Sequence, residues 1–195
     1  MNLPNLLSLL RIILTPLFII LLFSESSSNR IFALIVFAVA AITDAYDGHL
    51  ARKYNLITPE GKFLDPLADK ILVLSAFFSF AFIGIIDFWM VWIISFRDLF
   101  ITGLRLIISS KGFEFVTSNL SKYKTAFQLT IIILTLIFLT IEGFNIDQLI
   151  PTLDLIKDYK IIYILTMFTA IFTAYTGIIY LYTNRIVIKD FINNS

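Results

Sequence analysis

Six long apolar stretches, separated by short polar clusters, run through this chain of 195 residues. A helix needs about 20 apolar residues to cross the hydrocarbon core of a bilayer. Hydrophobic residues make up 58% of the chain and charged residues only 15%, whereas soluble domains carry about 25% charged residues. We therefore expect an all-α integral membrane protein, with residues 1–195 forming one domain. Its six transmembrane helices should lie near 6–23, 31–50, 63–86, 88–109, 126–141 and 161–183.

The first apolar stretch has no cationic lead-in and no clear small-residue cleavage site before Ser24, so we interpret it as a retained span rather than a secretory signal. Orientation follows from Lys and Arg, which concentrate in cytoplasmic connections. With the N-terminus inside, three cations face outward, namely Arg30, Lys157 and Lys160. Nine face inward, which predicts that both termini are cytoplasmic: Arg52, Lys53, Lys62, Arg105, Lys111, Lys122, Lys124, Arg185 and Lys189.

Composition also narrows the chemistry. The chain has no cysteine and one histidine, His49, which excludes disulfides, thiolate nucleophiles and sites built from several His or Cys ligands. The net charge is +1, so no basic excess points to nucleic acid as a partner. Any reaction must therefore use Asp, Glu, Lys, Arg or hydroxyl groups.

One segment, residues 44–70 (DAYDGHLARKYNLITPEGKFLDPLADK), concentrates acidic residues beside apolar runs. Asp44 and Asp47 are three residues apart, and Asp65 and Asp69 are four apart, so on helices each pair projects from one face. Four carboxylates near a membrane need compensating charge. Hard oxygen ligands suit two Mg²⁺ or Mn²⁺ ions, which can clamp the oxygens of a phosphoryl transfer. The alternative is that these aspartates are loop residues paired with nearby cations, namely Arg52, Lys53, Lys62 and Lys70.

Small residues within this segment leave room for a ligand. Gly48 and Ala51 share a helix face and form a shallow slot for a flat nucleotide, and Arg52 follows with a planar group suited to phosphate. Eight positions over 26 residues spell the pattern DxxDGxxARx8GxxxDxxxD: Asp44, Asp47, Gly48, Ala51, Arg52, Gly61, Asp65 and Asp69.

This pattern resembles the signature of the CDP-alcohol phosphatidyltransferase family. The resemblance implies a bundle of six transmembrane helices, a homodimer, and a cytoplasm-facing polar cavity that holds two divalent cations. It assigns the metal ligands to Asp44, Asp47, Asp65 and Asp69, and the general base to Asp69. It assigns the cytidine diphosphate site to Asn5, Asp44, Gly48, Ala51, Arg52 and Gly61. Arg11 resembles part of the same nucleotide region, although it could equally reach the membrane interface.

The acceptor must be inferred from the remaining cations on the predicted cytoplasmic side. Arg97 and Arg105 are eight residues apart, which places them within about 80° of each other on a helix. A phosphorylated acceptor needs several such cations, because Arg and Lys bind phosphate by charge-assisted hydrogen bonds. The positive-inside rule alone could also account for each of them. We expect the acceptor phosphate site to comprise Arg97, Arg105, Lys122, Lys124 and Arg185.

The wider pattern NLPNLLSLLRI, GKFLDPLADK, RDLFITGLR and KYKTAFQ resembles the bacterial phosphatidylglycerophosphate synthases within this family. The resemblance implies transfer of a phosphatidyl group from CDP-diacylglycerol to sn-glycerol 3-phosphate at the bacterial cytoplasmic membrane. Asp98 stands where Glu is more usual, His49 where an aromatic residue is common, and Ser121 where Gly often precedes the Lys. These departures put only the acceptor-site geometry in doubt.

Two other functions stay open. A cardiolipin, phosphatidylserine or phosphatidylinositol phosphate synthase would share the eight-residue pattern and use a different acceptor. A divalent-cation transporter could use the acidic cluster for ions in transit, but the chain carries no second copy of the acidic segment. His49 is expected to have a polar rather than catalytic role. The aromatic residues near span ends are expected to form interfacial belts: Trp89, Trp92, Tyr175, Tyr180 and Tyr182.

Overall fold

The protein is described by a computed structural model over residues 3–24, 26–53, 59–112, 119–144 and 146–193, with side chains over 6–24, 26–43, 66–112, 120–144 and 146–193. These residues form eight helices and no strand, which confirms the expected all-α fold. The long helices are α1 (Leu3–Leu22), α2 (Ser27–Lys53), α3 (Pro59–Ile83), α4 (Phe88–Ser110), α5 (Asn119–Phe144) and α7 (Ile161–Thr183). The short ones are α6 (Ile150–Asp158) and α8 (Arg185–Asn193).

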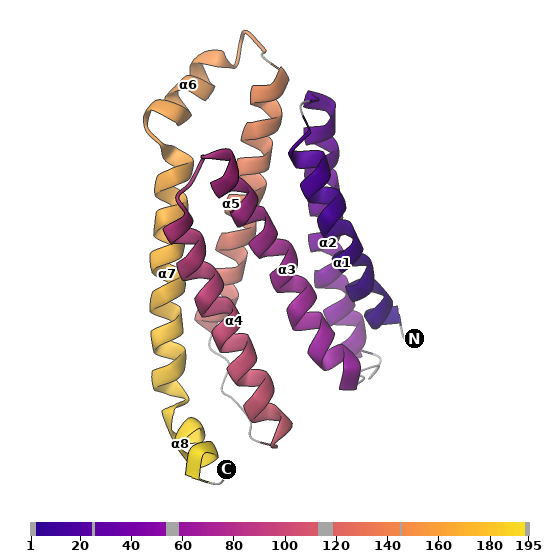
Figure 1. Ribbon diagram of the computed structural model, residues 1–195, viewed down its shortest axis with the longest axis vertical. Coiled ribbons are helices and arrows are strands. Elements are labelled where there is room, and N and C mark those ends of the chain that lie inside the picture. Colours follow the sequence, from indigo (N-terminus) through magenta and orange to yellow (C-terminus); the bar gives the residue numbers. More distant parts are fainter. Residues whose placement is uncertain (1–2, 25, 54–58, 113–118, 145, 194–195) are drawn as a thin grey trace.

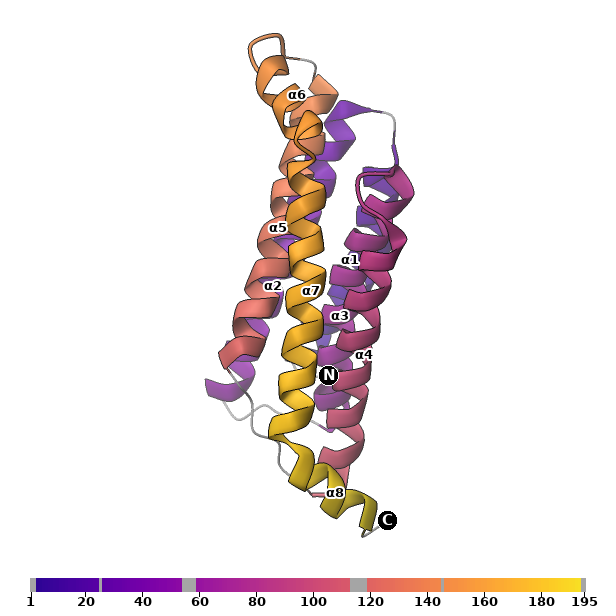
Figure 2. The ribbon, with the colours of Figure 1, turned by 90° about the vertical axis from the view of Figure 1, so that its left-hand side faces the viewer.

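The long helices run along one common direction as a bundle (Figure 1). Helix α1 packs against α2 and α3, α4 against α3 and α7, and α5 against α2 and α7. Helix α6 lies at one end of the bundle and α8 at the other, and the view turned by 90° agrees (Figure 2). We refer to these as the α6 end and the α8 end. Helices α2, α4 and α7 finish toward the α8 end, where α3 and α5 begin.

Three described helical segments are long and apolar enough to cross a membrane: Pro66–Ile83 in α3, Leu120–Phe144 in α5 and Ile161–Thr183 in α7. Two shorter apolar segments, Leu6–Leu22 and Ser27–Thr43, lie in α1 and α2. Helix α4 is mostly apolar, but Arg97 and Asp98 near its middle and Arg105 in its second half interrupt the apolar run. The described segments are therefore those of a membrane protein, and six crossings stay a prediction.

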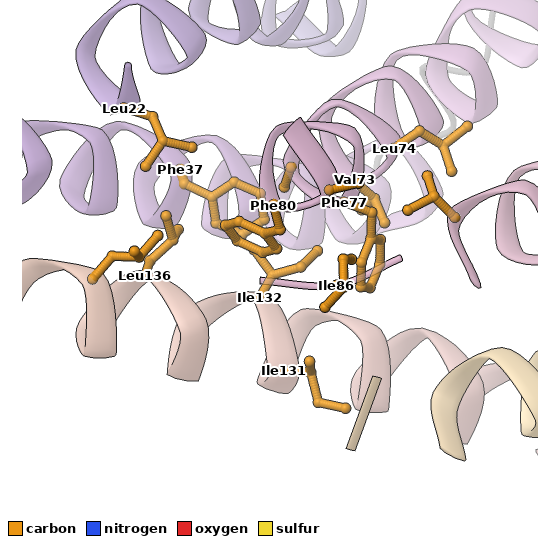
Figure 3. Packing of buried hydrophobic residues seen from close by; sticks show 14 of the residues in the cluster. Leu22, Phe37, Val73, Leu74, Phe77, Phe80, Ile86, Ile131, Ile132 and Leu136 are labelled. Carbon is orange, nitrogen blue, oxygen red and sulfur yellow. The ribbon is translucent and has the colours of Figure 1, made fainter. Parts of the chain in front are cut away.

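Aliphatic, aromatic and alanine side chains fill the core, to which all of the long helices contribute. The rings of Phe18 and Phe37 lie 5.5 Å apart between centroids, and neither side chain is exposed. Phe37, Phe80 and Ile132 come from α2, α3 and α5 and point into one shared space (Figure 3). Lipid is as apolar as these residues, so close van der Waals packing rather than water exclusion stabilises such contacts.

A short turn reverses the chain between α3 and α4. Gly84 has a φ of +86°, a left-handed conformation that glycine adopts without strain. The Gly84 N–H donates to the Ala81 carbonyl (3.1 Å) and the Ile85 N–H to the Phe80 carbonyl (3.0 Å), which is the Schellman pattern of helix ends. The turn satisfies these otherwise unpaired carbonyls and sends α4 back along α3 toward the α8 end.

Candidate active site

The two halves of the acidic segment lie on neighbouring helices. Asp44 and Asp47 belong to the last three turns of α2, and Asp65 and Asp69 to the first three turns of α3. Both regions lie toward the α8 end (Figure 1). Among the predicted metal and nucleotide residues, only Asp69 has a described side chain. The other side chains fall outside the described residues: Asn5, Asp44, Asp47, Gly48, Ala51, Arg52, Gly61 and Asp65.

A cavity of about 980 Å³ opens between α3, α4, α5 and α7. Among the described residues, its lining has one carboxylate, Asp69, and four cations: Lys70, Arg97, Arg105 and Lys124. Hydroxyl groups complete much of the remaining polar wall, which includes Thr102, Ser109, Ser110, Ser121, Thr125 and Tyr180. We call it the cationic cavity. Its excess of positive charge suits an anionic ligand carrying more than one negative charge.

Asp98 lies behind the wall of the cationic cavity and is completely buried. Its carboxylate accepts hydrogen bonds from Lys124 Nζ on both oxygens (2.6 and 2.7 Å), from Arg97 Nη1 (3.1 Å) and from Gln128 Nε2 (3.2 Å). A buried charge is costly unless it is paired and hydrogen-bonded. Asp98 therefore fixes one cation from α4 and another from α5 at the cavity wall. The sequence indicated no such role, because Asp98 stood out there only as a departure from the family pattern.

Arg97 retains binding capacity after this contact. Its Nη1 atom pairs with Asp98, whereas its buried Nε and Nη2 atoms have no hydrogen-bond partner among the described residues. Guanidinium groups bind phosphate through paired N–H donors. Arg97 can thus hold Asp98 with one nitrogen and still offer two donors to an anion.

Asp69 belongs to the acidic segment and also lines the cationic cavity. Its carboxylate accepts a hydrogen bond from Lys70 Nζ at 2.6 Å and is 22% exposed. A partly exposed carboxylate oxygen is a suitable ligand for a hard divalent cation. The part of the chain with described side chains contains no group of three or more Asp, Glu, His or Cys residues able to hold a metal, so the predicted four-carboxylate site is represented there by Asp69 alone.

The five predicted acceptor residues divide into two groups. Arg97, Arg105 and Lys124 line the cationic cavity together, and Lys124 is only 1% exposed. Lys122 is exposed and outside the lining. Arg185 begins α8, where its guanidinium lies 4.2 Å from the centre of the Tyr182 ring.

Burial decides between two interpretations of Arg11 and corrects the one of Tyr180. Arg11 is completely buried in α1, which excludes the alternative that its side chain reaches the membrane interface; its place in the nucleotide region stays a prediction. Tyr180 is 4% exposed and lines the cationic cavity, whereas Tyr175 and Tyr182 are exposed. Helical spacing explains the difference, since residues three or four apart share a face and Tyr180 follows buried Thr173, Thr176 and Gly177.

Gln128 has no role in the sequence prediction, yet its amide helps to hold Asp98. A signal was available, because Gln128 lies four residues after Lys124 and so shares a helix face with it. The sequence could not show that Asp98 of α4 faces this pair, since that contact joins residues far apart in the chain.

The sequence is similar to known proteins of one family. The family model for CDP-alcohol phosphatidyltransferases matches residues 1–175, and the chain belongs to this family. A probable phosphatidylglycerophosphate synthase of Mycobacterium tuberculosis is 41% identical over 57% of this chain, which spans about half (54%) of that relative. CDP-diacylglycerol–glycerol-3-phosphate 3-phosphatidyltransferases are 39% identical in Bacillus subtilis (64% of this chain, 70% of the relative) and 35% identical in Rickettsia bellii (90% and 92%).

Proposed function

We propose that the protein is a metal-dependent enzyme that transfers the phosphatidyl group of CDP-diacylglycerol to sn-glycerol 3-phosphate. Its products are phosphatidylglycerol phosphate and CMP. The observation that carries this proposal is that Asp69, the last aspartate of the family pattern, lines the same cavity as Arg97, Arg105 and Lys124. The names of the relatives in Bacillus subtilis and Rickettsia bellii support the same donor and acceptor.

The cations of the cavity bind the acceptor phosphate. The Nε and Nη2 atoms of Arg97 donate to phosphate oxygens, and Arg105 and Lys124 add positive charge from the same wall. Lys122 and Arg185 lie outside the lining and contribute longer-range attraction for the anion. Held in this way, the acceptor presents its 1-hydroxyl toward Asp69.

Asp69 acts as the general base. Its carboxylate takes the proton of the acceptor hydroxyl as the oxygen attacks the lipid-linked β-phosphorus, and the bond from that phosphorus to the CMP oxygen breaks. The Lys70 ammonium, 2.6 Å from Asp69, holds this carboxylate in place at the cavity wall.

Four carboxylates from α2 and α3, Asp44, Asp47, Asp65 and Asp69, provide an all-oxygen set for two Mg²⁺ or Mn²⁺ ions. When bound, these ions supply positive charge that stabilises the leaving CMP phosphate. Asn5, Gly48, Ala51, Arg52 and Gly61 receive the cytidine diphosphate, as the family pattern implies.

The enzyme forms one membrane domain of six crossings in the bacterial cytoplasmic membrane and acts as a homodimer. Both termini and the α8 end face the cytoplasm, where the soluble acceptor enters. This orientation is supported by the gathering of Lys and Arg toward that end and by α1 beginning on the same half of the bundle as α8 (Figure 1).

The test is CMP release from detergent-solubilised protein with CDP-diacylglycerol and Mg²⁺ or Mn²⁺. We expect turnover with glycerol 3-phosphate and none after addition of a chelator. Serine, inositol phosphate and phosphatidylglycerol serve as competing acceptors. Turnover with one of these alone would overturn the acceptor assignment but keep the reaction class, and a folded sample inactive with every acceptor would overturn both.

A further inference from the structure

Gly177 lies in the interior of α7, within a segment that is long and apolar enough to cross a membrane. Its side of α7 is buried, and its backbone φ is not in the left-handed region, which among the described glycines is occupied by Gly84 and Gly112. A glycine inside a helix is less favourable than an alanine because it loses more backbone freedom on folding. Backbone geometry therefore gives no reason for glycine at this position, and its surroundings must.

The neighbour of Gly177 is the stem of Arg97. A Cβ atom built on Gly177 would lie 2.8 Å from Arg97 Cγ, 3.5 Å from Nε and 3.7 Å from Cδ. The first distance is far below van der Waals contact. Because Cγ is the second carbon of the side chain, only a change of the first side-chain torsion or a separation of α4 from α7 could relieve the overlap.

Either change would move the guanidinium group. Arg97 Nη1 donates to the Asp98 carboxylate at 3.1 Å, which fixes the guanidinium group. The aliphatic stem of Arg97 therefore lies between this fixed group and the backbone of α7. We propose that Gly177 is a positioning residue for acceptor recognition: lacking a side chain, it lets the Arg97 stem lie on α7 and so sets the guanidinium at the wall of the cationic cavity. This inference rests on the proposed function, in which Arg97 binds the acceptor phosphate.

The kinetic test compares Gly177→Ala with Gly103→Ala in the full-length protein. Gly103 lies in α4, and a Cβ atom there would meet nothing within 4 Å, so it controls for adding a methyl group to a helix. We expect Gly177→Ala to raise the KM for glycerol 3-phosphate about tenfold, the equivalent of one hydrogen bond to a charged group. The KM for CDP-diacylglycerol should change by less than about twofold. Equal effects on both substrates, or none, would overturn the positioning role.

A stability cycle tests the contact without using activity. The melting temperature in detergent is measured for wild type, Gly177→Ala, Arg97→Ala and the double variant. We expect Gly177→Ala to lower the melting temperature by about 2 °C or more in the wild-type background, and to be neutral or stabilising once Arg97 is alanine. If Gly177 only lets the helix backbones approach, the loss will be the same in both backgrounds, and the proposal fails.

The two arms separate the failures. If the wild type does not use glycerol 3-phosphate, the proposed function fails, and the stability cycle still decides whether Gly177 accommodates Arg97. If Gly177→Ala does not fold, recovery of a folded protein in the double variant supports the inference, and no recovery contradicts it.

Discussion

The two ends of the bundle both carry charged groups, but they use them differently. At the α6 end, a pocket of about 450 Å³ is lined by two acids and two lysines: Asp87, Glu142, Lys157 and Lys160. Lys157 pairs with Glu142 at 2.7 Å, and Asp87 accepts hydrogen bonds from Tyr163 (2.7 Å) and Trp89 (3.3 Å). These contacts are exposed to solvent, where ion pairs contribute little to stability. The charges that line this pocket are balanced, and the pocket has the character of an ordinary polar surface.

The described lining of the cationic cavity has an excess of cations instead, and the ion pair behind its wall is buried. Asp98 is 0% exposed and Lys124 1%, whereas the side chains of Lys157 and Glu142 are 48% and 32% exposed. One carboxylate serves two cations and an amide, so positive charge remains for a ligand. The difference teaches that a binding site is indicated by charge that the protein leaves uncompensated, more than by the number of charged residues.

Removing the proposed base should have the largest effect. We expect Asp69→Asn to lower kcat by about 10²- to 10⁴-fold, the usual contribution of a general base, while the protein stays folded. The matched variant at the α6 end, Asp87→Asn, should leave kcat nearly unchanged. Steady-state CMP release measures both, and Asp69→Asn with most of its activity would remove the base assignment.

Removing the buried carboxylate should have a similarly large effect on folding. Asp98→Ala leaves Lys124 and Arg97 without their shared partner in a buried site, which typically costs about 3–5 kcal/mol. Asp87→Ala, at an exposed position, should cost far less. Thermal unfolding in detergent compares the two. Similar losses of stability in the two variants would mean that burial of the carboxylate does not distinguish the two ends.

A smaller effect is expected from a single cation at the cavity wall. Arg105→Ala should raise the KM for glycerol 3-phosphate about tenfold, in line with about 1.5–3 kcal/mol for a hydrogen bond to a charged group, with little change for the lipid donor. Lys111→Ala removes an exposed cation just after α4 and should change neither constant. Parallel changes for both substrates would argue against an acceptor site at Arg105.

The smallest effect is expected at the α6 end. The Glu142 carboxylate accepts a hydrogen bond from Lys157 Nζ, which raises the pKa of Lys157 above its usual value. A raised lysine pKa stabilises the fold at neutral pH, and this contribution is lost as the pH rises through that pKa. Glu142→Gln should therefore cost less than about 1 kcal/mol at pH 7, with the difference from wild type vanishing at strongly alkaline pH. A difference that grows with pH would contradict this sign.

Hydropathy predicted the helices well because each long helix is mostly apolar, but it placed the starts of α1, α2 and α3 three or four residues late and that of α5 seven residues late. The fifth apolar stretch was expected to begin near residue 126, whereas α5 begins at Asn119. Its first two turns include Ser121 and Lys124, which line the cationic cavity, so their polarity serves the site and hides the helix from an apolar scan. Helices α6 and α8 were not predicted, because nine residues are too few to cross a bilayer.

Spacing along the sequence placed Arg97 and Arg105 on one face, and both line the cavity. The same reasoning could not find Asp98 as the partner of Lys124 and Gln128, because this contact joins α4 to another helix, α5. It also could not find Gly177, whose importance depends on a side chain 80 positions away in sequence. Local periodicity identifies faces of helices, whereas the pairing of faces is a property of the folded chain.

The tight turn at Gly84 bears on how the protein assembles. It joins α3, which carries Asp69, to α4, which carries Arg97, as an antiparallel pair of neighbouring helices. Contacts between segments close in sequence form early, because little chain entropy is lost in closing a short loop. Once α3 and α4 have left the ribosome and paired, they bring one acid and three cations of the cavity to the same end of the bundle, namely Asp69, Lys70, Arg97 and Arg105. Helices α5 and α7 can then dock onto a half-built site.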